Sequence, residues 1–161
     1  MRTVIGVMGG GCADARVEDL ARTMGQLIAG AGWVLLNGGR DAGVMAASAQ
    51  GAAEAGGLVI GVLPDDDWVG IAPHVDVQII TGMGDARNAI NVLSSRVVVA
   101  LPGGAGTISE IALALKAGRP VVTLGFPVGD TFAEQRSAGR LVETDTPEEA
   151  AAAVRAFLGE A

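Results

Sequence analysis

The residues with the clearest chemical potential lie in one short stretch, PGGAGTISE, at residues 102–110. It follows an apolar run and leads into a segment with helical character, so its glycines fall between a strand and a helix. Such a turn exposes backbone N–H groups, and the helix dipole adds positive potential at the same place. The stretch therefore predicts an anion site, most naturally for phosphate, although a tight turn that needs glycine for its geometry alone remains the alternative. The predicted phosphate contacts are Pro102, Gly103, Gly104, Gly106 and Thr107.

Alternating apolar and helical segments must position this turn. Strands are expected over residues 3–8, 33–37, 58–63, 77–80, 96–101 and 120–125. Helices are expected over residues 17–30, 43–55, 85–94, 107–117 and 146–158. Continuous Val, Ile and Leu runs that alternate with helices are typical of a parallel sheet covered on both faces. The predicted fold class is α/β: one domain over residues 1–161, with a doubly wound, Rossmann-like, mostly parallel sheet and helices on both faces.

The ends of the expected strands indicate where a ligand would bind. In doubly wound folds, ligands lie beyond the carboxyl ends of the strands. The first, second, fourth and fifth expected strands each lead into a glycine-containing loop, so we expect these loops to build the site. Arg40 can reach a phosphate there or can lie on the surface. Further ligand-binding residues predicted from these loops are Gly10, Gly11, Gly39, Arg40, Met83, Gly84 and Asn88.

Composition excludes several classes of partner. The formal net charge is −7 and aromatic residues make up 3% of the chain, so neither a basic stripe nor a stacking platform for nucleic acid is expected. Apolar runs are far shorter than the roughly 18 residues that span a bilayer, and the amino-terminal run breaks at glycines, so we expect a cytoplasmic protein without a membrane partner. The acidic run 65–67 is interpreted as a solvated loop, and no metal site is predicted.

Two longer motifs carry a resemblance to a known family. PGGAGTISE (102–110) matches the pattern PGGxGTxxE, and NGGRDAGVMAASAQGAAEAGGLVIGVLP (37–64) matches a glycine loop, an alanine-rich helix and a GGxVIGVxP strand. In this order they resemble the LOG proteins, cytokinin-activating phosphoribohydrolases that are often mislabelled lysine decarboxylases. The stretch TGMGDARNAINVLSSRVVVALPGG (81–104) looks closer to a sister branch, which includes the molybdenum-cofactor carrier proteins and many uncharacterised bacterial proteins.

The resemblance implies two catalytic residues. In the hydrolase branch, the motif's glutamate and an earlier arginine act on an N-glycosidic bond; by motif these are Glu110 and Arg87. A carboxylate stabilises the oxocarbenium-like state of such a cleavage, and an arginine fork can hold phosphate or a ribose hydroxyl. Two alternatives stay open, because Glu110 can form a capping box with Thr107 and Arg87 can be a solvated helix residue. The hydrolases carry a basic residue after the arginine, whereas this chain has Asn88.

These observations predict a protein that binds a nucleotide monophosphate or related phosphate-bearing ligand, as a carrier of the LOG-like superfamily. The alternative is a phosphoribohydrolase that cleaves a nucleoside 5'-monophosphate to free base and ribose 5-phosphate. A lysine decarboxylase is not expected, because the one lysine, Lys116, falls in the last turn of a helix, where a cation meets the dipole. No cofactor is required, although an AMP-like nucleotide or the molybdenum cofactor can be the bound ligand. The family typically forms dimers or larger assemblies, so we expect a homodimer or higher homo-oligomer.

Overall fold

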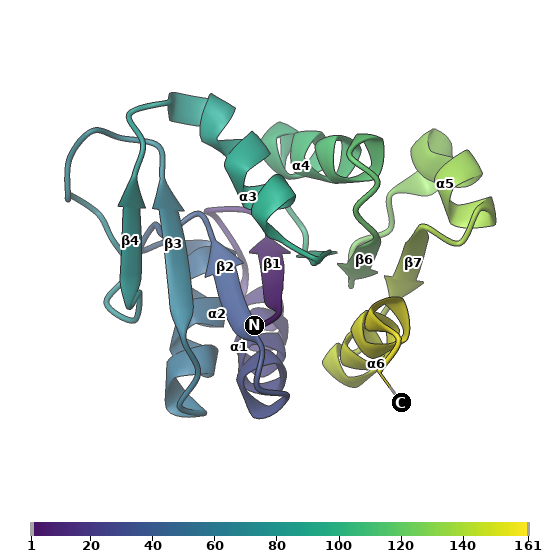
Figure 1. Cartoon of the computed structure of the whole chain (residues 1–161), viewed down its shortest axis with the longest axis horizontal. Coiled ribbons are helices and arrows are strands. Elements are labelled where there is room, and N and C mark those ends of the chain that lie inside the picture. The colour runs from purple at the N-terminus through teal and green to yellow at the C-terminus, as the bar shows by residue number, and fades with distance from the viewer. Residues whose placement is uncertain (1, 161) are drawn as a thin grey trace.

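The computed structural model describes residues 2–160 and contains one seven-stranded sheet (Figure 1). Every strand pairing in it is parallel, and the order is β4-β3-β2-β1-β5-β6-β7. The strands are β1 (Val4–Met8), β2 (Val34–Asn37), β3 (Val59–Leu63), β4 (Val77–Ile80), β5 (Val97–Ala100), β6 (Val121–Leu124) and β7 (Leu141–Thr144). The chain runs outward from β1 to β4 and then returns to place β5 beside β1. The topological switch point of this doubly wound sheet therefore lies between β1 and β5.

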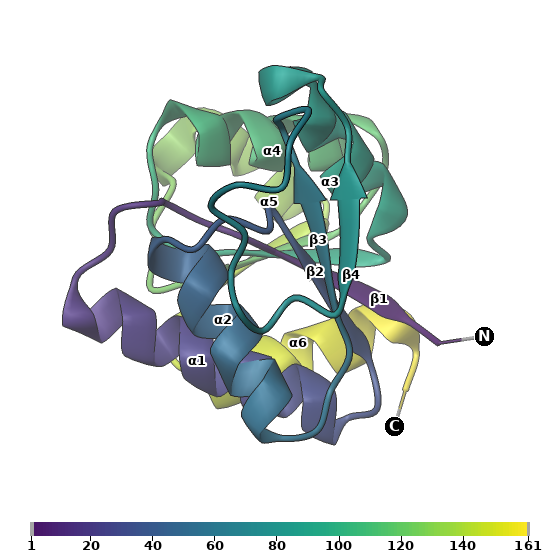
Figure 2. The ribbon, with the colours of Figure 1, turned by 90° about the vertical axis from the view of Figure 1, so that its left-hand side faces the viewer.

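Helices cover both faces of the sheet. Figure 2 shows α3, α4 and α5 on one face and α1, α2 and α6 on the other. The helices are α1 (Ala15–Gly30), α2 (Gly43–Glu54), α3 (Asn88–Ser94), α4 (Ala105–Lys116), α5 (Ala133–Ser137) and α6 (Pro147–Leu158), with the short 3-10 helices η1 (Gly84–Arg87) and η2 (Gly129–Phe132). Alternate side chains of the strands feed two separate cores, as Val97 and Val99 pack on one face and Val98 on the other. In residues 2–160 no helix is long and apolar enough to cross a membrane.

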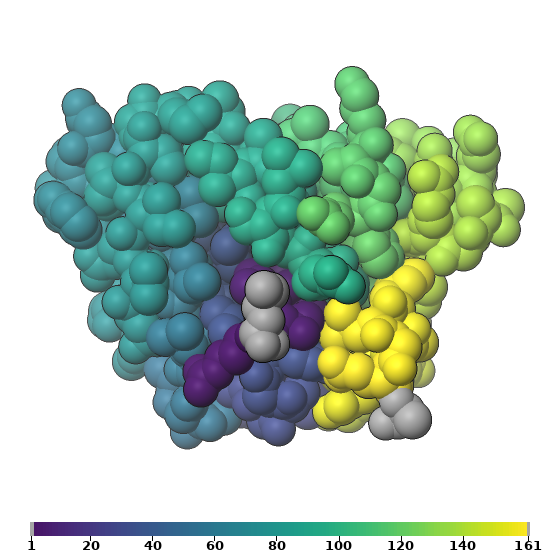
Figure 3. All heavy atoms as spheres, viewed as in Figure 1, coloured from purple at the N-terminus to yellow at the C-terminus, as the bar shows by residue number. Residues whose placement is uncertain are grey.

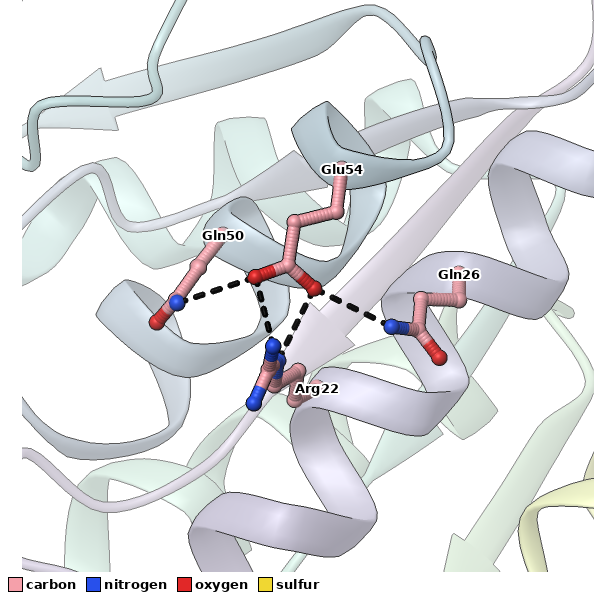
Figure 4. A network of polar contacts seen from close by, with 4 residues as sticks. All are labelled: Arg22, Gln26, Gln50 and Glu54. Carbon is pink, nitrogen blue, oxygen red and sulfur yellow. Dashed lines mark hydrogen bonds and ion pairs between the residues drawn. The ribbon is translucent and has the colours of Figure 1, made fainter.

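The helices α1 and α2 pack closely because glycines lie at their contact. A Cβ on Gly25 or on Gly51 would overlap backbone atoms of the facing helix. An exposed polar network then joins the two helices (Figure 4): Arg22 donates two hydrogen bonds to Glu54, at 2.9 and 2.7 Å, and glutamines from both helices donate to the same carboxylate. The Arg22 bonds lower the pKa of Glu54 below its ordinary value. This packing holds the two helices that follow β1 and β2 as one layer.

The expected fold class is confirmed, and three local predictions need correction. The sheet has a seventh strand, β7, and the short helix α5 precedes it; neither was predicted, because their sequences, LVET and AEQRS, contain few apolar residues. Helix α4 begins at Ala105 rather than at residue 107. Thr107 therefore lies inside the helix rather than at its N-cap, which excludes the capping box with Glu110 that the sequence left open as an alternative.

Candidate functional site

A cavity of about 230 Å³ lies at the carboxyl ends of the strands, next to the switch point. Four loops build its wall, namely those after β1, β2, β4 and β5, and these are the four that the sequence predicts. Its lining residues are Val7, Met8, Gly9, Gly10, Gly11, Gly38, Met45, Asp85, Arg87, Asn88, Gly104, Gly106, Thr107 and Glu110. We call this space the first cavity.

The first turn of α4 presents free backbone groups to the first cavity. Helices α1 and α6 have side-chain caps, from Asp14 and Thr146, but the N-cap of α4 is Gly104, and no side chain caps that helix. The first N–H groups of a helix have no partner within the helix, and the dipole makes that end attractive to anions. The uncapped turn therefore has the geometry that suits an anion, and phosphate contact by its residues stays a prediction.

Two glycines of this turn are not required by the fold. A Cβ on Gly104 or on Gly106 would meet no atom within 4 Å, and neither glycine has a positive φ. By contrast, a Cβ on Gly103 would overlap the Thr107 side chain, and one on Gly9 would come within 2.7 Å of three atoms of Val44. Glycine also costs helix stability relative to alanine. The open space at Gly104 and Gly106 therefore fits a ligand rather than a packing need.

The loop after β2 leaves room for the side chain of Arg87, which comes from η1 and lines the same cavity. Asn37 is fully buried, and its amide nitrogen donates to the Met45 carbonyl at 2.9 Å while its amide oxygen accepts from the Gly39 N–H at 2.8 Å. These bonds fix the loop that carries Gly38. A Cβ on Gly38 would overlap the guanidinium of Arg87 and come within 2.6 Å of the Met45 sulfur, so glycine is needed for both side chains to lie there.

Glu110 and Arg87 are, with Asp85, the charged residues of the wall. Glu110 is only 7% exposed, and the fully buried Asn91 donates from its amide nitrogen to Glu110 Oε1 at 3.0 Å. Burial raises the pKa of the Glu110 carboxyl, while the Asn91 bond and the nearby Arg87 charge act in the opposite direction. Burial also lowers the pKa of Arg87, whose Nε is buried and has no hydrogen-bond partner within residues 2–160. An anion in the cavity would offset the desolvation of this guanidinium.

The structure brings most predicted site residues together, and it separates some of them. Those that line the first cavity are Gly10, Gly11, Arg87, Asn88, Gly104, Gly106, Thr107 and Glu110. Pro102 and Gly103 line a neighbouring cavity. Those that line neither are Gly39, Arg40, Met83 and Gly84. Arg40 forms an ion pair with Asp65, and Gly39 is a buried glycine with φ 73° at which a Cβ would come within 3.1 Å of the Leu63 side chain. Ligand contact by these four stays a prediction.

Sequence reasoning missed several residues of the first cavity. Gly38 and Asp85 adjoin predicted positions and follow from the same loops. Met45 was not among the predicted site residues, yet it lines the cavity and is partly exposed. Asn91, which holds Glu110, carried no motif signal because its role depends on the packing of α3 against α4.

A parallel sheet whose switch-point crevice receives a PGGxGTxxE turn defines a Rossmann-like protein of the LOG-like type. Residues 2–151 match the SLOG cluster4 family, and the chain belongs to that family.

Solved structures and a curated relative agree with this assignment. The molybdenum cofactor binding protein of the phototrophic bacterium Rippkaea orientalis is 42% identical, covers 98% of each chain and gives a TM-score of 0.92. The molybdenum cofactor carrier protein of Chlamydomonas reinhardtii is 43% identical over 99% of this chain and 100% of that one, with a TM-score of 0.90. The cytokinin riboside 5'-monophosphate phosphoribohydrolase of Mycobacterium tuberculosis is 36% identical over 99 residues, 60% of this chain and 53% of that protein.

Proposed function

We propose that this protein binds and carries a small phosphate-bearing ligand of the pterin or nucleotide class, with the molybdenum cofactor as the favoured cargo. The observation that carries the proposal is the open, uncapped start of α4, where Gly104 and Gly106 leave space that the fold does not use. Two relatives that share more than 40% of their residues with this chain are described as binding or carrying the molybdenum cofactor. The cavity wall supports the same class of ligand.

Different residues of the first cavity bind different parts of the ligand. Backbone N–H groups at the start of α4 donate hydrogen bonds to the phosphate, and no lysine is needed for this. The guanidinium of Arg87 lies over the end of β2 and supplies the positive charge that faces the ligand. The Met45 side chain also lies beside Gly38, and it offers an adaptable apolar surface to the ring of a bound pterin or base. A molybdenum cofactor would enter as cargo, without any step of chemistry in this protein.

A phosphoribohydrolase is the second candidate function. Arg87 and Glu110 line one cavity, which places the two groups implied by the hydrolase branch beside the phosphate site. A curated relative with that activity matches 60% of this chain. A base, its ribose and the phosphate would then span the first cavity, with the glycosidic bond near Glu110.

One experiment separates the two functions. Purified protein is titrated calorimetrically with AMP, with N6-substituted AMP and with a pterin phosphate, and each mixture is then analysed by chromatography for free base. Binding without release of base supports the carrier. Release that Glu110→Gln abolishes, with phosphate binding retained, supports the hydrolase. Failure of all three compounds to bind would overturn both functions.

We further propose that the chain forms a homo-oligomer through the face that carries α3 and α4. Figure 3 shows this face, where the segments coloured teal to green form the upper surface. Leu93 is 55% exposed and lies with Leu113 along an apolar hollow between the two helices. Residues 86–129 contain a single acidic residue, the buried Glu110. On a chain of net charge −7, two copies that meet here therefore avoid repulsion between exposed carboxylates.

A further inference from the structure

A buried polar atom next to the first cavity has no hydrogen-bond partner. Asn91 is fully buried, and its amide nitrogen donates to Glu110 Oε1 at 3.0 Å. Its amide oxygen, Oδ1, is buried as well and has no partner within residues 2–160. A buried acceptor that is left unsatisfied lowers the stability of a fold, and such atoms are rare in native proteins. Asn91 Oδ1 therefore lacks a donor.

A protonated Glu110 can supply this donor. An ionised carboxylate only accepts hydrogen bonds, whereas a protonated carboxyl group also has one O–H that donates. A carboxyl group and a primary amide can then form two hydrogen bonds, one from the amide N–H to a carboxyl oxygen and one from the carboxyl O–H to the amide oxygen. Asn91 already makes the first of these bonds to Glu110. A proton on Glu110 would complete the pair.

The surroundings of Glu110 offer little compensation for a negative charge. Arg87 is the only cation among the residues that line the first cavity, and within residues 2–160 it forms no ion pair with Glu110. Asp85 adds a second carboxylate to the wall, but it is exposed to water. The strands on which α4 packs, β5 and β6, carry no ionisable side chain. Burial raises the pKa of the Glu110 carboxyl, and the Asn91 bond and the Arg87 charge oppose that rise.

An anionic ligand would shift this balance toward the protonated carboxyl. Arg87 faces the cavity, and its Nε is buried without a partner in residues 2–160, so a bound anion would engage this guanidinium. The anion would then offset the positive field that Arg87 now exerts on Glu110. It would also place its own negative charge in the same cavity of about 230 Å³. Like charges that share a site favour protonation of the carboxyl group.

We propose that Glu110 takes up a proton when an anionic ligand enters the first cavity, and that its O–H then donates to Asn91 Oδ1. Ligand binding is thereby coupled to pH. Because the ligand raises the pKa of Glu110 in the complex, the added affinity is fully present below the pKa of the free protein. It is lost as pH rises through the pKa of the complex. The inference rests on the proposed function, because it assumes an anionic ligand in this cavity.

Calorimetry in buffers that differ in their heat of ionisation counts the protons taken up on binding. The probes are AMP and inorganic phosphate, each titrated at several pH values above the ordinary glutamate pKa. Wild type should take up as much as about one proton more per bound probe than Glu110→Gln does. The ratio of wild-type to variant affinity should fall by up to about tenfold for each pH unit. Comparing the two proteins cancels the titration of the phosphate group itself, which is common to both.

Asp85→Asn is the matched control, because it removes the other carboxylate of the cavity wall. Asp85 is exposed to water, so this variant should take up as many protons as wild type.

Infrared difference spectra between free and AMP-bound protein give an independent readout. The carbonyl band of a protonated carboxyl group should appear on binding to wild type and should be missing with Glu110→Gln. Asn91→Leu should move this band, because the carboxyl O–H then loses its acceptor. An unmoved band would remove Asn91 from the proposal.

The outcomes separate the inference from the proposed function. If wild type and Glu110→Gln bind the probes with the same proton uptake at every pH, or if uptake is lost in Asp85→Asn instead, the proton on Glu110 is overturned and the phosphate site remains. If neither AMP nor inorganic phosphate binds to wild type, the phosphate site and the inference are overturned together. Extra uptake that Glu110→Gln abolishes, together with the carbonyl band, establishes a proton-linked ligand site.

Discussion

Replacing Gly106 with alanine should stabilise the fold and weaken the ligand. Gly106 lies within α4, and a Cβ there would meet no atom within 4 Å, so the methyl group enters open space. Glycine in a helix is less stable than alanine by about 0.5–1 kcal/mol. For a chain of this size 1 kcal/mol corresponds to roughly 2–4 °C, so the melting temperature should rise by about 1–4 °C.

The same methyl group should interfere with the phosphate. It stands beside the backbone N–H groups of the first turn, and a displaced phosphate loses at least one charge-assisted hydrogen bond. Such a bond contributes about 1.5–3 kcal/mol, which corresponds to a dissociation constant raised roughly 10- to 100-fold.

The assay compares thermal unfolding without ligand and calorimetric titration with the ligand that binds wild type. Gly30→Ala is the matched control, because Gly30 is also an exposed helical glycine whose Cβ would meet nothing within 4 Å, but it lies at the end of α1 away from the cavity. It should gain stability and leave affinity unchanged. If Gly106→Ala binds the ligand as tightly as wild type does, the ligand does not occupy the space at the start of α4, and the proposed phosphate site is wrong.

Three further predictions concern charge and assembly. Because burial raises the pKa of Glu110 in the folded state, its contribution to stability is present below the ordinary glutamate pKa and is lost as pH rises through the folded pKa. Glu110→Gln should therefore gain stability relative to wild type in urea unfolding as pH rises above the ordinary glutamate pKa, and a difference that stays constant with pH would contradict this. The pKa of Glu54 is lowered by Arg22, so its contribution is present above the ordinary value and is lost as pH falls; Glu54→Gln should be less stable than wild type at neutral pH, and the difference should vanish in acid. Leu93→Asp should reduce the oligomer to a smaller species in light scattering, and an unchanged mass would remove the α3–α4 face as the interface.

The sheet was predictable from sequence because its strands are buried on both faces. Runs such as residues 96–101 are continuously apolar, and their alternation with helices leaves few other arrangements. The carboxyl-end loops followed from the same reasoning, since parallel strands all end at one edge. The elements that were missed are β7 and α5, at four and five residues. Other strands of four residues were predicted because their sequences are mostly apolar, whereas LVET and AEQRS contain few apolar residues.

The site was predictable as a set of loops but not as a set of contacts. Loop position placed Gly104 and Gly106 correctly at the cavity, yet it could not tell them from Gly39, which is buried in packing against β3. That distinction depends on what surrounds each missing side chain. The role of Asn91 depends likewise on the approach of two helices that are separated in sequence by β5. The three-dimensional surroundings of a glycine or a side-chain amide, and not its residue type, decide whether it takes part in a ligand site.

Glu110 illustrates how those surroundings bear on function. The sequence left it between a helix cap and a catalytic carboxylate, and the structure excludes the cap because α4 begins five residues earlier. A carboxylate stabilises an oxocarbenium-like state through its negative charge. Burial disfavours that charge at this position, and the amide of Asn91 holds one of the two oxygens. Only the field of Arg87 and the Asn91 bond oppose the burial, and an anionic ligand beside Glu110 would disfavour its charge further. A carboxyl group whose burial works against its charge is a poorer partner for a cation than a solvated carboxylate, and this favours a cavity that holds its ligand over one that cleaves it.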